Sequence, residues 1–257
     1  MDVVNLLKEE VRMIDLPKLE KAFEYENNFY LLCDSKRMAK IIAQYKLFEK
    51  TLQIEGDIIE CGVFKGASFS RFAMFRQVHD LEEKKLIGFD TFGDFPETEY
   101  EKDKELREKF IEGAGNKSIS CQQLMDVLLN KQCDSNVSLI QGNIVKTVPE
   151  FVNSHQNLKI SLLNIDVDIY EPTVTILEYL YPLVSKNGII ILDDYGTFPG
   201  ETNAVDEYFL GKNVSIDIHN LIKIWGDRSE WEQQNRFTKI KFKNGVRIAI
   251  KPCPIAC

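Results

Sequence analysis

Three aspartates follow two apolar segments of the chain and form the first candidate site for chemistry. Asp166 ends the apolar segment 160–166, and Asp193 and Asp194 lie at the end of the apolar segment 189–193. If both segments are parallel strands of one sheet, their carboxyl ends share an edge and the three side chains converge. Carboxylates so close repel one another and raise each other's pKa, which a cation relieves. Oxygen ligands suit Mg²⁺, Mn²⁺ or Ca²⁺ rather than zinc, so we predict a divalent metal site; helix caps or water-facing acids are the ordinary alternative.

A second set of residues follows the other predicted strands and is suited to a nucleoside cofactor. Gly62 and Gly66 lie between the strand 57–61 and a helix, so a ligand can approach the backbone closely. A carboxylate of that ligand can accept hydrogen bonds from the N–H groups at the start of the helix. Asp90 ends the next strand, where an acid can bind ribose hydroxyls. The fingerprint G-x-G-x-x-G and the P-loop are both missing, which argues against NAD and ATP. The cofactor residues predicted in these stretches are Gly62, Phe64, Asp90, Thr91, Phe92, Gly142, Asn143 and Asp166.

The elements that must position these residues alternate between short apolar segments and helical patterns. Helical stretches such as 173–183 separate the apolar segments, which is typical of βαβ units in a parallel sheet with helices on both faces. The predicted strands are 57–61, 86–90, 137–141, 160–166 and 189–193. After a helix near 203–210, Asn244-Gly245 between the alternating segments 237–242 and 246–250 predicts an antiparallel hairpin. The predicted fold is therefore an α/β, Rossmann-like sheet, mostly parallel with an antiparallel C-terminal hairpin, plus N-terminal helices.

Two segments lie outside this alternation. Residues 1–52 show helical spacing of apolar residues and are predicted to form a helical cap, whereas 53–257 form a single globular unit. The first apolar residues of the cap are suited to an oligomer contact, a lid or packing against the sheet; they are Leu6, Leu7, Val11 and Ile14. The segment 96–116 is unusually charged, which is typical of a solvated helix with a flexible loop or of a lid over a substrate.

Composition argues against several classes of protein. The 257 residues are 44% hydrophobic and 28% charged, an ordinary globular balance. The formal net charge is −8 and no run of Lys or Arg stands out, which argues against a nucleic-acid partner. No stretch approaches about 18 apolar residues, and the N-terminus carries acids where a signal peptide is basic. We therefore expect no membrane span and a cytoplasmic location. The six cysteines form no C-x-x-C pair, which favours reduced thiols over a zinc site.

Several of these stretches resemble motifs of the macrocin O-methyltransferase family of antibiotic and polysaccharide biosynthesis. The resemblance covers about residues 50–210 and rests on the segments 56–66, 89–96, 166–173, 191–196 and 203–209. It implies a class I methyltransferase fold, S-adenosylmethionine as the methyl donor, and Mg²⁺ held by Asp166, Asp193 and Asp194. It also implies cofactor roles for Glu60, Gly62, Ser68 and Asp90. The family often has Asp-Gly-Asp where this chain has Asp166-Val167-Asp168, a departure that concerns the local turn.

From the resemblance we expect metal-dependent methylation of a sugar hydroxyl, with a nucleotide-activated sugar as the substrate. We also expect the protein to form a homo-oligomer. A metal that binds two neighbouring hydroxyls lowers the pKa of the one attacked, and a carboxylate then accepts its proton. Asp166 is the first candidate for this base and Asp168 the second. His219 is a further candidate only if its strand folds over the site.

Other acceptors and one non-enzymatic role remain open at this point. A catechol-type or other small diol also offers two neighbouring hydroxyls, and N-methylation of an amino sugar would need the metal less. The sugar is either nucleotide-linked or already attached to a lipid or aglycone. A non-catalytic protein that binds S-adenosylmethionine is the remaining alternative, although such a protein has no need of acids at the cofactor edge.

Overall fold

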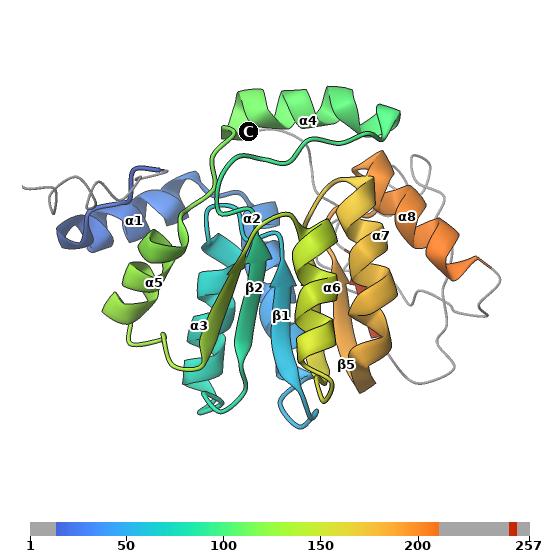
Figure 1. The fold of residues 1–257 in the computed structure, drawn as a ribbon. Helices are drawn as coiled ribbons and strands as arrows, with labels where there is room; N and C mark the ends of the chain where they lie inside the picture. Colours follow the sequence, from blue (N-terminus) through green and yellow to red (C-terminus); the bar gives the residue numbers. More distant parts are fainter. Residues whose placement is uncertain (1–13, 211–246, 251–257) are drawn as a thin grey trace, which may run out of the picture.

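A six-stranded parallel sheet forms the centre of the protein. The computed structural model describes residues 14–210 and 247–250. The strand order is β3-β2-β1-β4-β5-β6, and every neighbouring pair is parallel (Figure 1). The strands are β1 Asp57–Cys61, β2 Leu86–Asp90, β3 Val137–Gln141, β4 Ile160–Ile165, β5 Val184–Leu192 and β6 Arg247–Ile250. Because the strand order changes direction between β1 and β4, a ligand crevice is expected at the carboxyl ends of these two strands.

The central strands are buried on both faces, which explains their almost continuous apolar sequences. All six residues of β4 are buried, as are the last five of β5. A parallel strand covered by helices on both faces has no side toward water and therefore lacks polar alternation. Two polar residues in this region, Glu60 and Asn164, are opposite each other in the β1–β4 register, and Asn164 Nδ2 donates to Glu60 Oε1 at 3.1 Å.

Helices cover both faces of the sheet and enclose two hydrophobic cores. The first core includes residues of α6 (Ile144–Ser154), α7 (Tyr170–Tyr179) and α8 (Pro199–Phe209), with a short 3-10 helix at Tyr181–Leu183. The second includes residues of α2 (Ser35–Glu49), α3 (Ala67–Val78) and α5 (Cys121–Asn130). A 3-10 turn at Leu19–Lys21 leads into α1 (Ala22–Leu32), which has no buried residue. The sheet with its two helical layers therefore supplies the rigid frame of the site.

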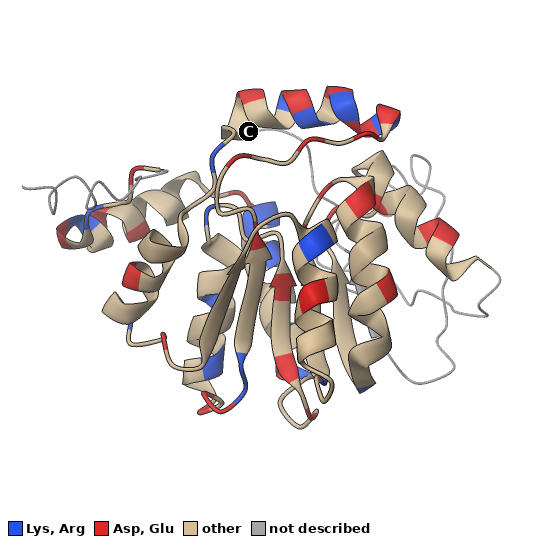
Figure 2. Cartoon of the chain, viewed as in Figure 1, with Lys and Arg blue, Asp and Glu red and all other residues tan. Residues whose placement is uncertain are grey.

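One helix lies outside these layers. Figure 1 shows α4 (Glu101–Ala114) running across the carboxyl ends of the strands, and Figure 2 shows charges of both signs along it. Asp103 is its one buried residue. The helix lies within the charged segment 96–116. Its position over the strand ends fits the interpretation of this segment as a lid over a substrate, which stays a prediction.

The predicted mostly parallel α/β fold is confirmed. The first five strands lie where predicted, except that β5 begins at Val184, and the predicted helix 173–183 spans Tyr170–Tyr179. β6 pairs parallel to β5. The predicted antiparallel hairpin joins 246–250 to the strand 237–242, so it stays a prediction. The predicted turn at Asn244-Gly245 and the strand 237–242 lie outside the described residues, as does His219.

The N-terminal helices and the thiols agree with the predictions as far as the described residues extend. α1 and α2 lie within the predicted cap, although the division at residue 52 stays a prediction. Ile14 packs against the second core, whereas Leu6, Leu7 and Val11 lie outside the described residues. Cys33, Cys61, Cys121 and Cys133 are free thiols. Within the described ranges, no helix is both long enough and apolar enough to span a bilayer.

Candidate active site

The loop after β4 depends on a glycine that meets the backbone of an aspartate. The amide of Asp166 donates to the carbonyl of Cys61 at 2.9 Å, which keeps this loop beside the end of β1. A Cβ atom on Gly62 would lie 1.7 Å from the carbonyl oxygen of Asp166, and Gly62 has a φ of +88°. Glycine alone tolerates both the close approach and this conformation. Gly62 is predicted to let the cofactor approach the backbone. Its missing side chain also allows the Asp166 loop to pack against the end of β1.

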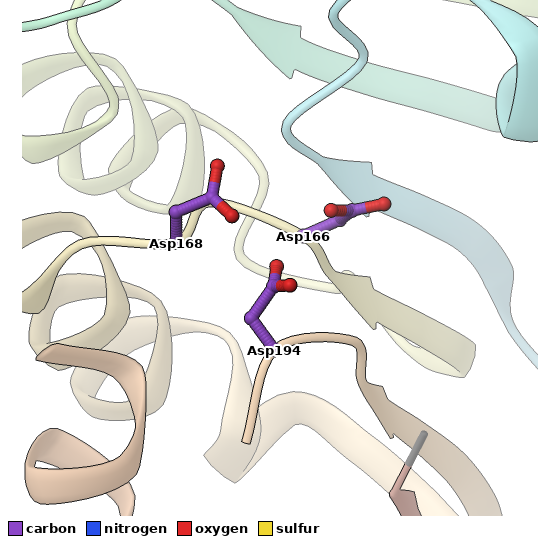
Figure 3. A group of neighbouring side chains, drawn as sticks. All are labelled: Asp166, Asp168 and Asp194. Atoms are coloured by element: carbon purple, nitrogen blue, oxygen red, sulfur yellow. The ribbon is translucent and has the colours of Figure 1, made fainter. Parts of the chain in front are cut away.

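Three aspartates are grouped at this edge of the sheet. One carboxylate oxygen from each of Asp166, Asp168 and Asp194 lies within 4.8 Å of the others, and Figure 3 shows the side chains around a common space. Asp168 is 7% exposed and Asp194 is 3% exposed. Burial, and next the charge of Asp166, raises the pKa of Asp168 to about 8. The group therefore concentrates carboxylates where water solvates their charge poorly.

Asp193 lies outside this group. Its Oδ2 is 3.0 Å from Nζ of Lys40 on α2, in an ion pair whose side chains are 4% and 20% exposed. The amide of Asp193 donates to Ile165 at 2.9 Å, so the chain is still extended there. Successive side chains of an extended chain point to opposite faces, which separates Asp193 from its neighbour Asp194. Of the three predicted metal ligands, the structure groups Asp166 and Asp194 and adds Asp168, which the sequence predicts as a base.

A buried glutamate that the sequence patterns did not single out supports the two aspartate loops. Glu201 lies in the first turn of α8 and is fully buried. Its Oε1 accepts from the amide of Asp194 at 3.2 Å, and its own amide donates to the carbonyl of Asp168 at 3.3 Å. Burial, followed by the charge of Asp194, raises its pKa well above the ordinary value. An acid in a first helical turn is a common sequence feature, so only the packing reveals this role.

Asp90, predicted to bind ribose, organises the glycine loop. Its Oδ2 accepts from the amides of Val63 and Phe64 at 2.8 and 2.9 Å. Its Oδ1 accepts from the amide of Phe92 at 2.7 Å. Because it accepts from amides of both loops, the carboxylate fixes the loop after β1 to the loop after β2. Phe64 and Phe92 both have positive φ values, and such strained turns persist only where their surroundings support them. Contact with a ribose stays a prediction.

Glu60 is a fully buried acid beneath the same loop. Its Oε1 accepts from the hydroxyl of Ser68 and from Asn164, whereas its Oε2 has no hydrogen-bond partner among the residues that the structure describes. Burial raises the pKa of Glu60 to about 8. At neutral pH the side chain is therefore mostly a neutral carboxylic acid.

A cavity of about 1660 Å³ lies over these residues at the carboxyl edge. Its wall is formed by α1, α2, the glycine loop, α4 and the two aspartate loops. Among the predicted cofactor residues, those that line it are Gly62, Phe64, Ser68, Asp90, Thr91, Asn143 and Asp166. Phe92 is instead buried in the second core, and Glu60 lies beneath the surface of the wall. Asn143 also caps α6 by accepting from the amide of Val145 at 2.9 Å.

Two further kinds of side chain line this cavity. Phenylalanines meet around α4, with ring centroids of Phe110 at 5.4 Å from Phe64, 5.4 Å from Phe95 and 6.5 Å from Phe198. Cationic groups come from α2 and α3; they are Lys36, Arg37, Lys40 and Arg71. Desolvation by burial lowers the pKa of Arg71. The cavity thus combines apolar rings, cations and the aspartate group.

Comparison with known proteins finds one family over most of the chain. The model of the macrocin-O-methyltransferases (TylF) matches residues 18–226. Demethyldecarbamoylnovobiocin O-methyltransferase of Streptomyces niveus is 28% identical over 187 residues, which are 70% of this chain and 67% of that protein. The 8-demethyl-8-(2,3-dimethoxy-alpha-L-rhamnosyl)-tetracenomycin-C 4'-O-methyltransferase of Streptomyces olivaceus is 27% identical over 149 residues, 55% of this chain and 54% of that protein.

A solved structure supports the fold assignment. The crystal structure of the calicheamicin methyltransferase CalS11 has a TM-score of 0.64 to this chain at 24% identity. The likeness covers 80% of this chain and 84% of that protein. The predicted class I fold is confirmed by this likeness.

Proposed function

The chain belongs to the macrocin-O-methyltransferase (TylF) family and is therefore an S-adenosylmethionine-dependent O-methyltransferase, and we propose that it methylates a sugar hydroxyl with the help of a divalent metal. The observation that carries this proposal is the group of Asp166, Asp168 and Asp194, whose oxygens lie within 4.8 Å of one another beside the glycine loop. A sugar acceptor is supported by the Streptomyces olivaceus relative, which is named for a rhamnosyl-bearing substrate.

The aspartate group has the donor set that a divalent cation needs. Its ligands are all carboxylate oxygens, which suit Mg²⁺ or Mn²⁺. Asp168 and Asp194 are almost fully buried, so their charges need compensation by a cation or a proton. When bound, the cation would orient neighbouring hydroxyls and lower the pKa of the one that attacks.

The protein's own residues then have separable tasks. The N–H groups at the start of α3, after Gly66, would bind the carboxylate of S-adenosylmethionine. In the transfer, the acceptor oxygen bonds to the methyl carbon as the carbon–sulfur bond breaks, so S-adenosylhomocysteine leaves. Asp166, as the first candidate, or Asp168, as the second, accepts the hydroxyl proton. Both residues line the same cavity, so an acceptor bound there can reach either carboxylate.

The acceptor in this proposal is a nucleotide-linked sugar. Lys36, Arg37 and Arg71 line the cavity wall and offer the donors that phosphate oxygens require. The alternative is a sugar already attached to an aglycone, as in the name of the Streptomyces olivaceus relative. The two acceptors differ in charge, so the cationic wall should favour the first.

Calorimetric titration of S-adenosylhomocysteine, followed by a methylation assay, tests the function. The panel contains nucleotide-linked deoxysugars, the matching phenyl glycosides and catechol, each with Mg²⁺ and with EDTA. We expect S-adenosylhomocysteine binding and Mg²⁺-dependent turnover of a nucleotide-linked sugar. Turnover of catechol alone, or turnover insensitive to EDTA, would contradict the acceptor or the metal respectively.

Asparagine variants separate the metal ligands from the base. We expect Asp194→Asn to weaken Mn²⁺ binding in calorimetry. A variant of Asp166 or Asp168 that keeps Mn²⁺ affinity but loses turnover identifies the base. If all these variants retain wild-type turnover, the aspartate group has no role in the reaction.

A further inference from the structure

The one buried side chain of α4 is a carboxylate. Asp103 has an exposure of 0%, whereas every other residue of this helix is partly or fully exposed. Burying an ionisable group on a helix that is otherwise charged and solvated is costly without specific partners. The partners of Asp103 therefore indicate what the helix is built to contact.

Asp103 caps two helices at once. Its Oδ2 accepts from the amide of Tyr170, the first residue of α7, at 2.9 Å. Its Oδ1 accepts from the amide of Gly200, the second residue of α8, at 2.7 Å. The first amides of a helix lack partners inside the helix, and a carboxylate there is favoured by the helix dipole. One side chain of α4 therefore accepts a hydrogen bond from an otherwise unpaired amide at the start of α7 and from another at the start of α8.

The fit at Gly200 is specific for glycine. A Cβ atom there would lie 1.9 Å from Asp103 Oδ2 and 2.5 Å from the amide nitrogen of Tyr170. Any larger residue at position 200 would push the carboxylate away from both amides. Asp103 and Gly200, which are 97 residues apart in sequence, are therefore matched to each other.

Both capped helices begin next to the aspartate loops. Tyr170 follows Asp168 by two positions, and α8 follows the loop that contains Asp194. Glu201, next to Gly200, connects these loops through its bonds to Asp194 and Asp168. A shift at either helix start would therefore move a member of the aspartate group.

A second set of contacts holds the segment before α4. The carboxylate of Glu171 accepts from the amides of Glu99 and Tyr100 at 2.8 and 3.0 Å, and from the hydroxyl of Thr98 at 2.9 Å. The rings of Tyr100 and Tyr170 are stacked at 4.6 Å. The N-terminal end of α4 is thus attached to α7 by both polar and aromatic contacts.

The other end of α4 reaches the glycine loop. Lys65 Nζ donates to the carbonyl of Ala114 at 2.6 Å, and Phe110 packs against Phe64. The helix therefore connects the predicted cofactor loop at one end with the aspartate loops at the other. Between these ends its residues line the cavity.

We propose that Asp103 is a positioning residue for methyl transfer. Its carboxylate locks α4 over the cavity and, through the starts of α7 and α8, holds the two aspartate loops in register with each other. This inference rests on the proposed function, because it assumes that the aspartate group acts on an acceptor under α4. Asp103 itself need not touch substrate or cofactor.

The variant Asp103→Asn tests the proposal with little change in volume. An asparagine has a single acceptor oxygen, and its amide group would face an N–H donor, so one of the two caps is lost. Glu108→Gln is the matched control, because it removes the same charge from an exposed position of the same helix. Hydrogen exchange measures how firmly the carboxylate holds the amides of α7 and α8. The KM and kcat for the acceptor measure how far methyl transfer depends on these contacts.

For Asp103→Asn we expect amide exchange at Tyr170, Gly200 and the first turn of α4 to accelerate by about tenfold or more. We expect the acceptor kcat/KM to fall by about tenfold or more while S-adenosylhomocysteine affinity changes little. Glu108→Gln should match the wild type in every readout. Gly200→Ala should reproduce the effects of Asp103→Asn, and the double variant should be no worse than either single variant, because both disrupt one contact.

Two results would overturn the proposal. Unchanged exchange in Asp103→Asn would mean that the carboxylate does not lock the helix. Faster exchange with wild-type kcat and KM would mean that the lock is purely structural. Failure of the proposed function has a different signature, since the wild-type protein itself would then methylate no sugar.

Discussion

Replacing Gly62 with alanine should displace the Asp166 loop. The new Cβ atom would lie 1.7 Å from the carbonyl oxygen of Asp166. Carbon and oxygen atoms in contact need about 3.3 Å, so one of the two segments must move by about 1.5 Å. The φ of +88° at this position adds a conformational cost for alanine of about 1–2 kcal/mol.

The expected effect on activity is larger than the effect on stability. A misplacement of about 1 Å in a catalytic group lowers the rate on the order of 100-fold, so we expect kcat/KM of Gly62→Ala to fall by at least that factor. The thermal midpoint should fall by about 4 °C or more, since a chain of this size loses roughly 2–4 °C per kcal/mol. Differential scanning fluorimetry and initial-rate kinetics measure the two quantities.

Gly196→Ala is the matched control. Gly196 has a φ of +85°, and a Cβ atom there would meet nothing within 4 Å. Its variant therefore carries the conformational cost without the clash, so it should lose stability but retain most of its activity. If Gly62→Ala were as active as Gly196→Ala, the close approach at Asp166 would not position the site and the reasoning would be wrong.

The remaining predictions concern the metal, pH and assembly. Asp193→Ala should retain Mg²⁺-dependent turnover, because Asp193 pairs with Lys40 and lies outside the grouped aspartates; loss of Mn²⁺ binding in calorimetry would return Asp193 to the metal site. Because burial raises the pKa of Glu60 from 4.5 to about 8, stability should fall as pH rises through that window. In thermal melts the slope should be smaller in Glu60→Gln, and an unchanged slope would contradict the neutral acid. Phe23 and Leu31 on α1 are 78% and 83% exposed, so we expect a homo-oligomer that covers both side chains. Replacing both with Glu should reduce the molar mass measured by light scattering to that of the monomer, and a monomeric wild type would contradict this prediction.

The position of α4 connects these predictions. The helix contacts the glycine loop through Lys65 and the starts of α7 and α8 through Asp103. A substitution of Gly62 or of Asp103 should therefore displace the same group of aspartate carboxylates. The two variants differ in what they change first, because Gly62 meets the backbone of Asp166 directly and Asp103 acts through helix starts.

The sequence by itself determined the strands, the edge at which the site lies and the family. Buried parallel strands are apolar throughout, so β1, β2, β3 and β4 could be located to within a residue, and their last residues had to share one edge. Asp166 and Asp194 could be assigned to the site for this reason. The spacing of Asp168, two positions after Asp166, was a further signal that both could face one space.

Only the tertiary structure decided which side chains meet. Asp193 lies against Lys40 of α2, and β6 lies parallel to β5; neither contact has a signal in the nearby sequence. The same holds for Asp103 and Gly200, whose contact depends on where α4 crosses the sheet. Hydrophobic periodicity reports the environment of each segment along its own length. The direction of a side chain and its distant partners depend on how separate segments pack, which that periodicity does not contain.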